Sequence, residues 1–217
     1  MAAAFVCGLN ASAQKVQKPQ AGTFGLEVQM NPFDQDGKTF QLDGLKMRYF
    51  VTDRDALRLK LGFSVDKNKY TPDTDKDPYN YTTSGNVSIA VAYERHFDLA
   101  PRLSAYVGGE VGIDREFAKS KNFVDDENWT KTKNSADSKR GRFGFQVNAI
   151  TGLDFYVYKG LYIGTELGLG VSSYKTLETT TTTCVANVET EVKSKDSTRS
   201  TTAKFEIEPV LRLGWNF

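Results

Sequence analysis

The residue types that commonly carry catalysis are scarce in this chain. It contains one histidine, His96, and two cysteines, Cys7 and Cys184. Acid–base and nucleophilic catalysis usually need a histidine or a thiol beside an orienting partner, and a zinc site needs several His or Cys ligands close together. The sequence has no such cluster. We therefore predict no catalytic, cofactor-binding or metal-binding residues, and no cofactor.

One acidic segment has the spacing of a cation-binding loop. Asp73-Thr-Asp-Lys-Asp77 places three carboxylates at alternate positions, as calcium loops do. The loop pattern also requires glycine at its sixth position and glutamate at its twelfth. This chain has Pro78 and Ser84 there. We interpret the segment as a solvated loop.

A larger group of charged residues shares one face of several expected strands. Residues two apart point to the same side of a strand, and here charged residues alternate with apolar ones. The charges are nearly balanced. They are Lys46, Arg48, Arg58, Lys60, Lys204 and Arg212 against Glu27, Glu94, Glu110, Asp154, Glu166, Glu206 and Glu208.

The same alternation predicts eight strands. They cover residues 22–30, 45–51, 57–65, 87–94, 103–113, 143–157, 163–171 and 205–217. Short turns near 52–56, 97–101 and 158–160 alternate with long polar connections at 31–40, 66–86, 118–141 and 175–202. Outer-membrane barrels have this arrangement, with short periplasmic turns and long external loops. A mean hydropathy of −0.46 does not argue against a barrel, because barrel strands are only half apolar.

Aromatic residues gather near the expected strand ends, as in the aromatic girdles of membrane barrels. At the turn side they are Tyr49, Tyr93, Phe97, Phe155, Tyr158, Tyr162, Trp215 and Phe217. At the loop side they are Phe33, Phe40, Phe63, Phe117, Phe143, Tyr174 and Phe205. Glycines such as Gly164 fall on the charged face, where a narrow lumen needs room for long side chains.

The alternating segment Leu211–Phe217, which finishes on an aromatic residue, resembles the last strand of the small eight-stranded outer-membrane β-barrel family that is OmpA- and OmpX-like. The resemblance covers residues 22–217. It implies an all-β, eight-stranded antiparallel up-and-down transmembrane β-barrel in the outer membrane, with both termini in the periplasm. It also implies contact with outer-membrane lipid and lipopolysaccharide, and recognition of Phe217 by the barrel-assembly machinery.

We expect three segments along the chain. Residues 1–13 would be an export signal, because Ala11 and Ala13 supply the small residues before a cleavage site, although the usual basic start is missing. Residues 14–21 would be a periplasmic lead-in and residues 22–217 the barrel. Cys7 would leave with the signal, and Cys184 would remain as an incidental single thiol. The balanced charge, +1 overall, makes nucleic acid an unexpected partner.

Three functions fit such a barrel. We predict a non-enzymatic protein with a surface-recognition or envelope-structural role, because balanced inward charges would pair and plug the lumen. A small-solute channel is the alternative. A lipid-modifying enzyme comes third, because relatives of that kind use a histidine near the outer leaflet, and His96 is expected at the periplasmic end as an interfacial aromatic. A soluble barrel with an apolar interior, such as a lipocalin, is a further fold to test.

The last long connection, 175–202, is unusual for a loop. Thr179–Thr183, Val185, Val188 and Val192 are β-branched residues, which favour extended chain. We therefore expect a protruding hairpin in which Leu169–Val188 pairs back toward Ser197–Phe205, with a tip near Lys193–Asp196. Its unpaired edges could bind another surface or envelope protein by strand addition.

Overall fold

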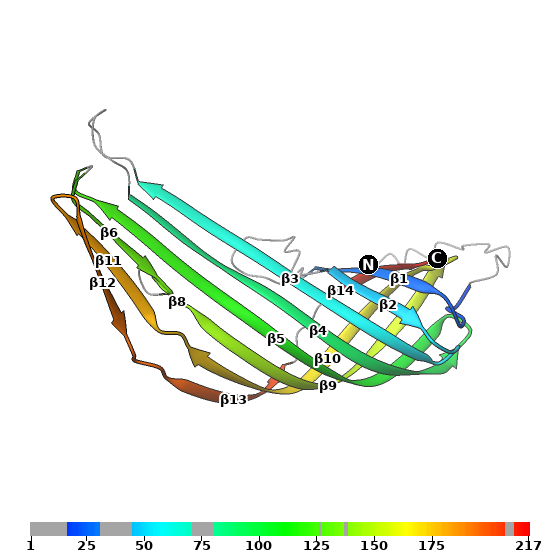
Figure 1. The fold of residues 1–217 in the computed structure, drawn as a ribbon. Helices are drawn as coiled ribbons and strands as arrows, with labels where there is room; N and C mark the ends of the chain where they lie inside the picture. Colours follow the sequence, from blue (N-terminus) through cyan, green and yellow to red (C-terminus); the bar gives the residue numbers. More distant parts are fainter. Residues whose placement is uncertain (1–16, 31–44, 71–79, 126, 137–138, 207–210) are drawn as a thin grey trace, which may run out of the picture.

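A computed structural model of the chain describes residues 17–30, 45–70, 80–125, 127–136, 139–206 and 211–217. Every element in these ranges is a β-strand (Figure 1). The strands are β1 (Phe24–Met30), β2 (Leu45–Phe50), β3 (Asp55–Tyr70), β4 (Asn80–Ala100), β5 (Leu103–Phe123), β6 (Trp129–Lys133), β7 (Ser135–Ala136), β8 (Lys139–Arg140), β9 (Arg142–Tyr158), β10 (Leu161–Thr176), β11 (Thr179–Val185), β12 (Val188–Ser194), β13 (Arg199–Glu206) and β14 (Leu211–Asn216). No helix in these ranges has the length and apolar character needed to cross a membrane. The expected signal at 1–13 and the acidic segment Asp73–Asp77 lie outside the described residues.

The strand pairings are antiparallel and close on themselves. Strand β1 pairs with β2 on one side and with β14 on the other. From β2 the order continues through β3, β4, β5, β9 and β10, and β10 pairs with β14. Strand β13 also pairs with β10, so β13 and β14 share one place in the ring. The described strands thus make a closed ring of eight positions, which confirms the predicted antiparallel up-and-down barrel.

Three strands extend farther than the sequence predicted. The pairing of β3 with β4 is unbroken from Asp55↔Arg95 to Tyr70↔Asn80, and β5 continues to Phe123. Much of the expected loops 66–86 and 118–141 is therefore strand. The sequence did not signal this because both faces of these outer parts carry polar residues, so the apolar alternation stops although the strand does not.

The short turns lie close to their predicted places. β2 and β3 are joined across residues 51–54, where the Thr52 hydroxyl donates to the Asp55 carboxylate at 2.6 Å and accepts the Asp55 N–H at 3.0 Å. β9 and β10 are joined at 159–160, where Lys159 has a φ of 46°. The β4–β5 turn differs most from its prediction at 97–101, because β4 runs to Ala100 and the chain reverses at residues 101–102.

The last long connection forms a hairpin, but not the one predicted. β10 pairs with β13 from Gly168↔Glu206 to Lys175↔Arg199, as expected. The tip is not at Lys193–Asp196. Instead β11 and β12 form their own hairpin, which turns at Ala186 and Asn187 with φ values of 48° and 63°. Two successive positive φ angles suit a two-residue hairpin turn. Strand β11 also pairs with β6, so β5, β6, β11 and β12 form a sheet that extends beyond the ring (Figure 1).

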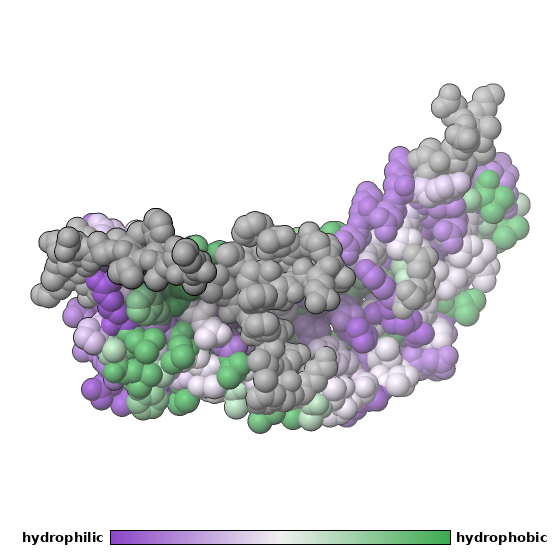
Figure 2. All heavy atoms as spheres, turned by 180° about the vertical axis from the view of Figure 1, so that it is seen from behind, coloured by the Kyte–Doolittle hydropathy of each residue, from purple (hydrophilic) through white to green (hydrophobic). Residues whose placement is uncertain are grey.

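The two faces of the barrel differ in polarity. Apolar side chains point outward and stay exposed, whereas charged side chains are buried inside. Figure 2 shows hydrophobic residues over the body of the barrel and many hydrophilic residues on the extended sheet. The outward set includes Leu57, Leu61, Phe63, Val87, Ile89, Val91, Val111, Phe155, Leu167, Leu169, Leu213 and Trp215. This arrangement is the reverse of a soluble barrel with an apolar interior, so that alternative is wrong.

Candidate functional site

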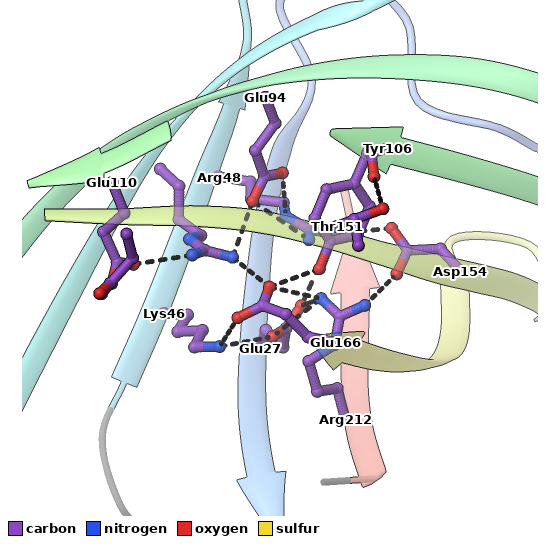
Figure 3. A network of polar contacts seen from close by, with 12 residues as sticks. Glu27, Lys46, Arg48, Glu94, Tyr106, Glu110, Thr151, Asp154, Glu166 and Arg212 are labelled. Atoms are coloured by element: carbon purple, nitrogen blue, oxygen red, sulfur yellow. Dashed lines mark hydrogen bonds and ion pairs between the residues drawn. The ribbon is translucent and has the colours of Figure 1, made fainter. Parts of the chain in front are cut away.

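Nine charged side chains meet inside the described part of the barrel (Figure 3). The alternation of each strand turns these positions inward. The cluster therefore receives side chains from all eight positions of the ring, which are β1 to β5, β9, β10 and β14. All except Glu166 expose 4% or less of their surface. The members of this charge cluster are Glu27, Lys46, Arg48, Arg58, Glu94, Glu110, Asp154, Glu166 and Arg212.

Arg58 joins three carboxylates from three other strands. Its Nη1 lies 2.8 Å from Glu94 Oε1 and 2.5 Å from Glu166 Oε2. Its Nη2 lies 2.7 Å from Glu110 Oε2. A planar guanidinium has enough donors in fixed directions to bind several carboxylates at once. Arg58 therefore ties β3 to β4, β5 and β10 across the lumen.

Arg48 and Arg212 make the same kind of contact on the other side of the cluster. Asp154 bridges them, with one oxygen 2.8 Å from Arg48 Nη1 and the other 2.7 Å from Arg212 Nη2. Arg212 also lies 3.1 Å from Glu27. Arg48 Nε lies 2.8 Å from Glu94 Oε2, but its N–H makes no hydrogen bond to that oxygen, so this contact is electrostatic.

Tyrosines complete the cluster and fill the space between the charges. The Tyr162 hydroxyl donates to Glu27 at 2.9 Å, and the Tyr106 hydroxyl donates to Glu166. The ring of Tyr106 is fully buried, with the guanidinium carbons of Arg48 and Arg212 at 4.9 and 5.2 Å from its centroid. Such cation–π contacts strengthen when water is excluded.

The sequence identified all nine charged members of the cluster but misplaced two aromatics. Tyr162 was expected in the turn-side girdle, yet it points into the lumen and exposes 1% of its surface. Tyr174 was expected in the loop-side girdle, but it shares the inward face of β10 with Tyr162, and the Arg142 guanidinium lies over its ring. Tyr106 was not singled out, although it has the same parity on β5 as the inward Glu110.

Four predicted inward charges do not appear in the cluster. Lys60 is only half-buried and makes no ion pair with a described carboxylate. Lys204 and Glu206 lie on β13, and their side chains are outside the described set. Glu208 lies in 207–210, which is not described.

Gly164 shows why small residues share the charged face. A Cβ atom at this position would lie 2.6 Å from Arg212 Nη2 and 2.6 Å from Asp154 Oδ1. Both distances are shorter than van der Waals contact. A larger residue here would displace the Arg212–Asp154 ion pair, which confirms the expected steric role of this glycine.

His96 lies at the turn end of the barrel, as predicted, but not at the lipid interface. It points inward and exposes 4% of its surface, with Nε2 3.2 Å from Glu94 Oε2. It lines a cavity of about 530 Å³ together with Lys18, Arg54, Asp98 and Tyr156. Segment 17–20 crosses this end, where Lys18 Nζ lies 2.5 Å from Asp98 Oδ1. A histidine inside the lumen cannot reach a lipid in the surrounding leaflet.

Other predicted features have simple structural settings. Cys184 is buried on β11 and is a free thiol. Among the described residues, no group of three His, Cys, Asp or Glu side chains is arranged to hold a metal ion.

The closed antiparallel ring, its outward apolar face and its charge-filled interior define an outer-membrane β-barrel protein. Residues 29–217 match the model of the Putative OmpA-OmpF-like porin family, and the chain belongs to that family. A similar solved structure is the N-terminal β-barrel domain of Pseudomonas aeruginosa OprF. It is 15% identical with a TM-score of 0.40, and the alignment covers 92% of this chain and all of that one. No curated protein matches the sequence.

Proposed function

We propose that this protein is a non-enzymatic, non-conducting outer-membrane barrel whose external sheet provides surface recognition. The observation that carries the proposal is the buried charge cluster, which spans the lumen and leaves its central residues at 4% exposure or less. A conducting pore needs hydrated lumen charges. Here the charged groups pair with one another and with Tyr106 and Tyr162, and only the Nε–H groups of the three arginines make no hydrogen bond within the cluster.

A second packed element lies toward the loop end, beyond the charge cluster. The short hairpin of β7 and β8 lies against the inward face of β4 and β5, where Ala118 and Ala136 are buried. Lys139 on this hairpin donates to the Ser84 hydroxyl at 3.1 Å and lies 3.6 Å from Asp66. The hairpin therefore covers part of the inward face of β4 and β5 beyond the level at which β2 pairs with β3.

Conductance in planar lipid bilayers tests the closed state. Wild-type protein should show no steady single-channel opening. Tyr106→Ala should produce openings, because it removes a fully buried ring from between two guanidinium groups. Tyr49→Ala is the matched control, since Tyr49 is 39% exposed and points away from the inward residues Arg48 and Phe50 on β2, and the variant should stay closed. Steady openings of the wild type would instead support the small-solute channel.

We infer the orientation of the barrel from its connections. The turns 51–54, 101–102 and 159–160 join strands at one end, and the extended sheet lies at the other (Figure 1). Short turns are periplasmic in bacterial outer-membrane barrels. We infer that both termini face the periplasm and that β6, β11 and β12 face outward.

Strand β12 is the surface that we assign to protein recognition. It pairs with β11 on one side, and no described strand pairs with its other side. An exposed edge can accept an extended segment of another protein through backbone hydrogen bonds. Residues Val188–Lys193 are all exposed, so no other described part of the chain covers this strand.

Amide hydrogen exchange on the detergent-folded protein tests the edge. β11 is flanked by β6 and β12, so its amides should exchange slowly. In β12 every second amide should exchange fast, because only one side of the strand is paired. Uniformly fast exchange through 179–194 would contradict the hairpin, and uniformly slow exchange would contradict the open edge.

A further inference from the structure

The outer face of the extended sheet carries two rows of lysines. Residues directly opposite in an antiparallel pair share a face. One row runs Lys67↔Thr83, Thr83↔Lys119 and Lys119↔Lys133 across β3, β4, β5 and β6. The next row runs Lys69↔Tyr81, Tyr81↔Lys121 and Lys121↔Lys131. We call these six lysines and the aromatics beside them the lysine–aromatic face.

This face continues the lipid-facing surface of the barrel. On β3 the outward residue Val65 is followed two residues later by Lys67, and on β5 the outward Ile113 has the same parity as Lys119. The registers from β3 to β5 are unbroken over this stretch, so no residue changes sides. At about 3.4 Å per residue, the first lysine row begins roughly 7 Å beyond Val65 along its strand. The face therefore lies just outside the band of outward apolar residues around the barrel, which we call the apolar belt.

The lysine pairs are unfavourable for the fold itself. Lys119 lies opposite Lys133, and Lys121 lies opposite Lys131. Like charges directly opposite one another destabilise a sheet. No described carboxylate forms an ion pair with Lys119, Lys131 or Lys133, and Glu191 on the same side of the sheet pairs with Lys193 at 3.3 Å. An external anion would supply the missing negative charge.

Aromatic rings lie next to these lysines. Lys121 Nζ is 4.1 Å from the ring centroid of Phe123 and 4.3 Å from that of Trp129. Phe123 and Trp129 are themselves directly opposite, and Tyr81 lies between Lys69 and Lys121. A flat aromatic surface can pack against the C–H face of a sugar ring, while neighbouring ammonium groups bind phosphate. The two kinds of residue together suit a phosphorylated saccharide better than a free phosphate ion.

We propose that the lysine–aromatic face binds the phosphorylated saccharide of the lipopolysaccharide in the leaflet around the barrel. This ligand combines the required charge with sugar rings. It is also held in the same leaflet that the apolar belt contacts, so it meets a face that begins directly beyond that belt. The assignment rests on the outward orientation proposed above, but binding of the isolated saccharide does not depend on that orientation.

The probe is the deacylated, still phosphorylated saccharide of lipopolysaccharide, which has no acyl chains to bind the apolar belt. Its affinity for the detergent-folded full chain is measured by calorimetry at several salt concentrations. Lys119→Gln with Lys133→Gln should weaken binding roughly 30-fold and reduce its salt dependence. The same pair should raise the melting temperature without ligand, because it removes an opposed pair of like charges.

The double variant that combines Lys159→Gln with Lys195→Gln is the matched control. It also removes two exposed positive charges, but from the turn at 159–160 and from the connection after β12. It should keep wild-type affinity. Three results would overturn the proposal: no binding by the wild type, equal affinity of the two double variants, or equal affinity for enzymatically dephosphorylated saccharide. Equally tight binding of a DNA oligonucleotide would show a general polyanion surface instead.

Discussion

Replacing Arg58 with alanine should destabilise the folded barrel by about 3 to 5 kcal/mol. The Arg58 side chain is 1% exposed and lies within 2.8 Å of oxygens from Glu94, Glu110 and Glu166. Removing one partner from a buried ion-pair network leaves the other charges without compensation, and that desolvation cost exceeds the value of the lost contacts. The free energy of unfolding is measured by reversible urea denaturation in lipid vesicles.

Lys60→Ala is the control for this prediction. Lys60 is two residues from Arg58 on the same face of β3, but it is half-buried and makes no ion pair with a described carboxylate. Its removal should change stability by no more than about 0.5 kcal/mol. If Arg58→Ala were as mild as Lys60→Ala, water would have to reach the three carboxylates. That result would favour a hydrated lumen and weaken the proposal of a closed barrel.

The inward charges could be predicted from sequence because the two sides of a membrane-barrel strand have very different surroundings. Lipid excludes charge from one face, so a period of two separates Arg58 and Glu94 from their neighbours without any knowledge of the fold. Their pairing could not be predicted in the same way. Arg58 meets Glu166, which is 108 residues away, because the tilt and stagger of the closed ring bring β3 and β10 together across the lumen.

The position of Tyr162 was predicted wrongly from the tendency of aromatic residues to lie at strand ends. The alternation of inward and outward residues along β10 would have predicted it correctly. An aromatic near a strand end suggests a girdle, but Tyr162 is two residues before Gly164, which belongs to the inward face of β10. The same parity places Tyr106 with Glu110 on β5. Side-chain direction in a strand is fixed by the backbone, so it takes precedence over the preference of tyrosine for interfaces.

The extended sheet was only partly predictable for a different reason. Beyond the membrane both faces of a strand contact water, so apolar alternation no longer marks it, and β-branched content alone indicated β11 and β12. The turn at Ala186 and Asn187 was missed in favour of the more polar segment 193–196. Asparagine tolerates a positive φ, and this local signal was available in the sequence.

Leu61→Arg should cost about 2 to 4 kcal/mol of folding free energy in a lipid bilayer. Leu61 points outward on β3 and is 37% exposed, with Ile89 opposite it on β4. It lies six residues from the turn-end start of β3 at Asp55, near the middle of an outward apolar series that ends at Val65. An arginine at the bilayer midplane must be transferred into hydrocarbon, and the cost falls to about 0 to 1 kcal/mol near the interface.

Val65→Arg tests this depth dependence on the same strand and the same face. Val65 lies at the outer limit of the apolar belt, next to Lys67, so its arginine variant should lose no more than about 1 kcal/mol. Both variants are unfolded by guanidinium in vesicles of one lipid composition, with wild type measured in parallel. Equal losses at the two positions would mean that the belt has been placed at the wrong depth. An unchanged Leu61→Arg would mean that this face of β3 does not contact lipid at all.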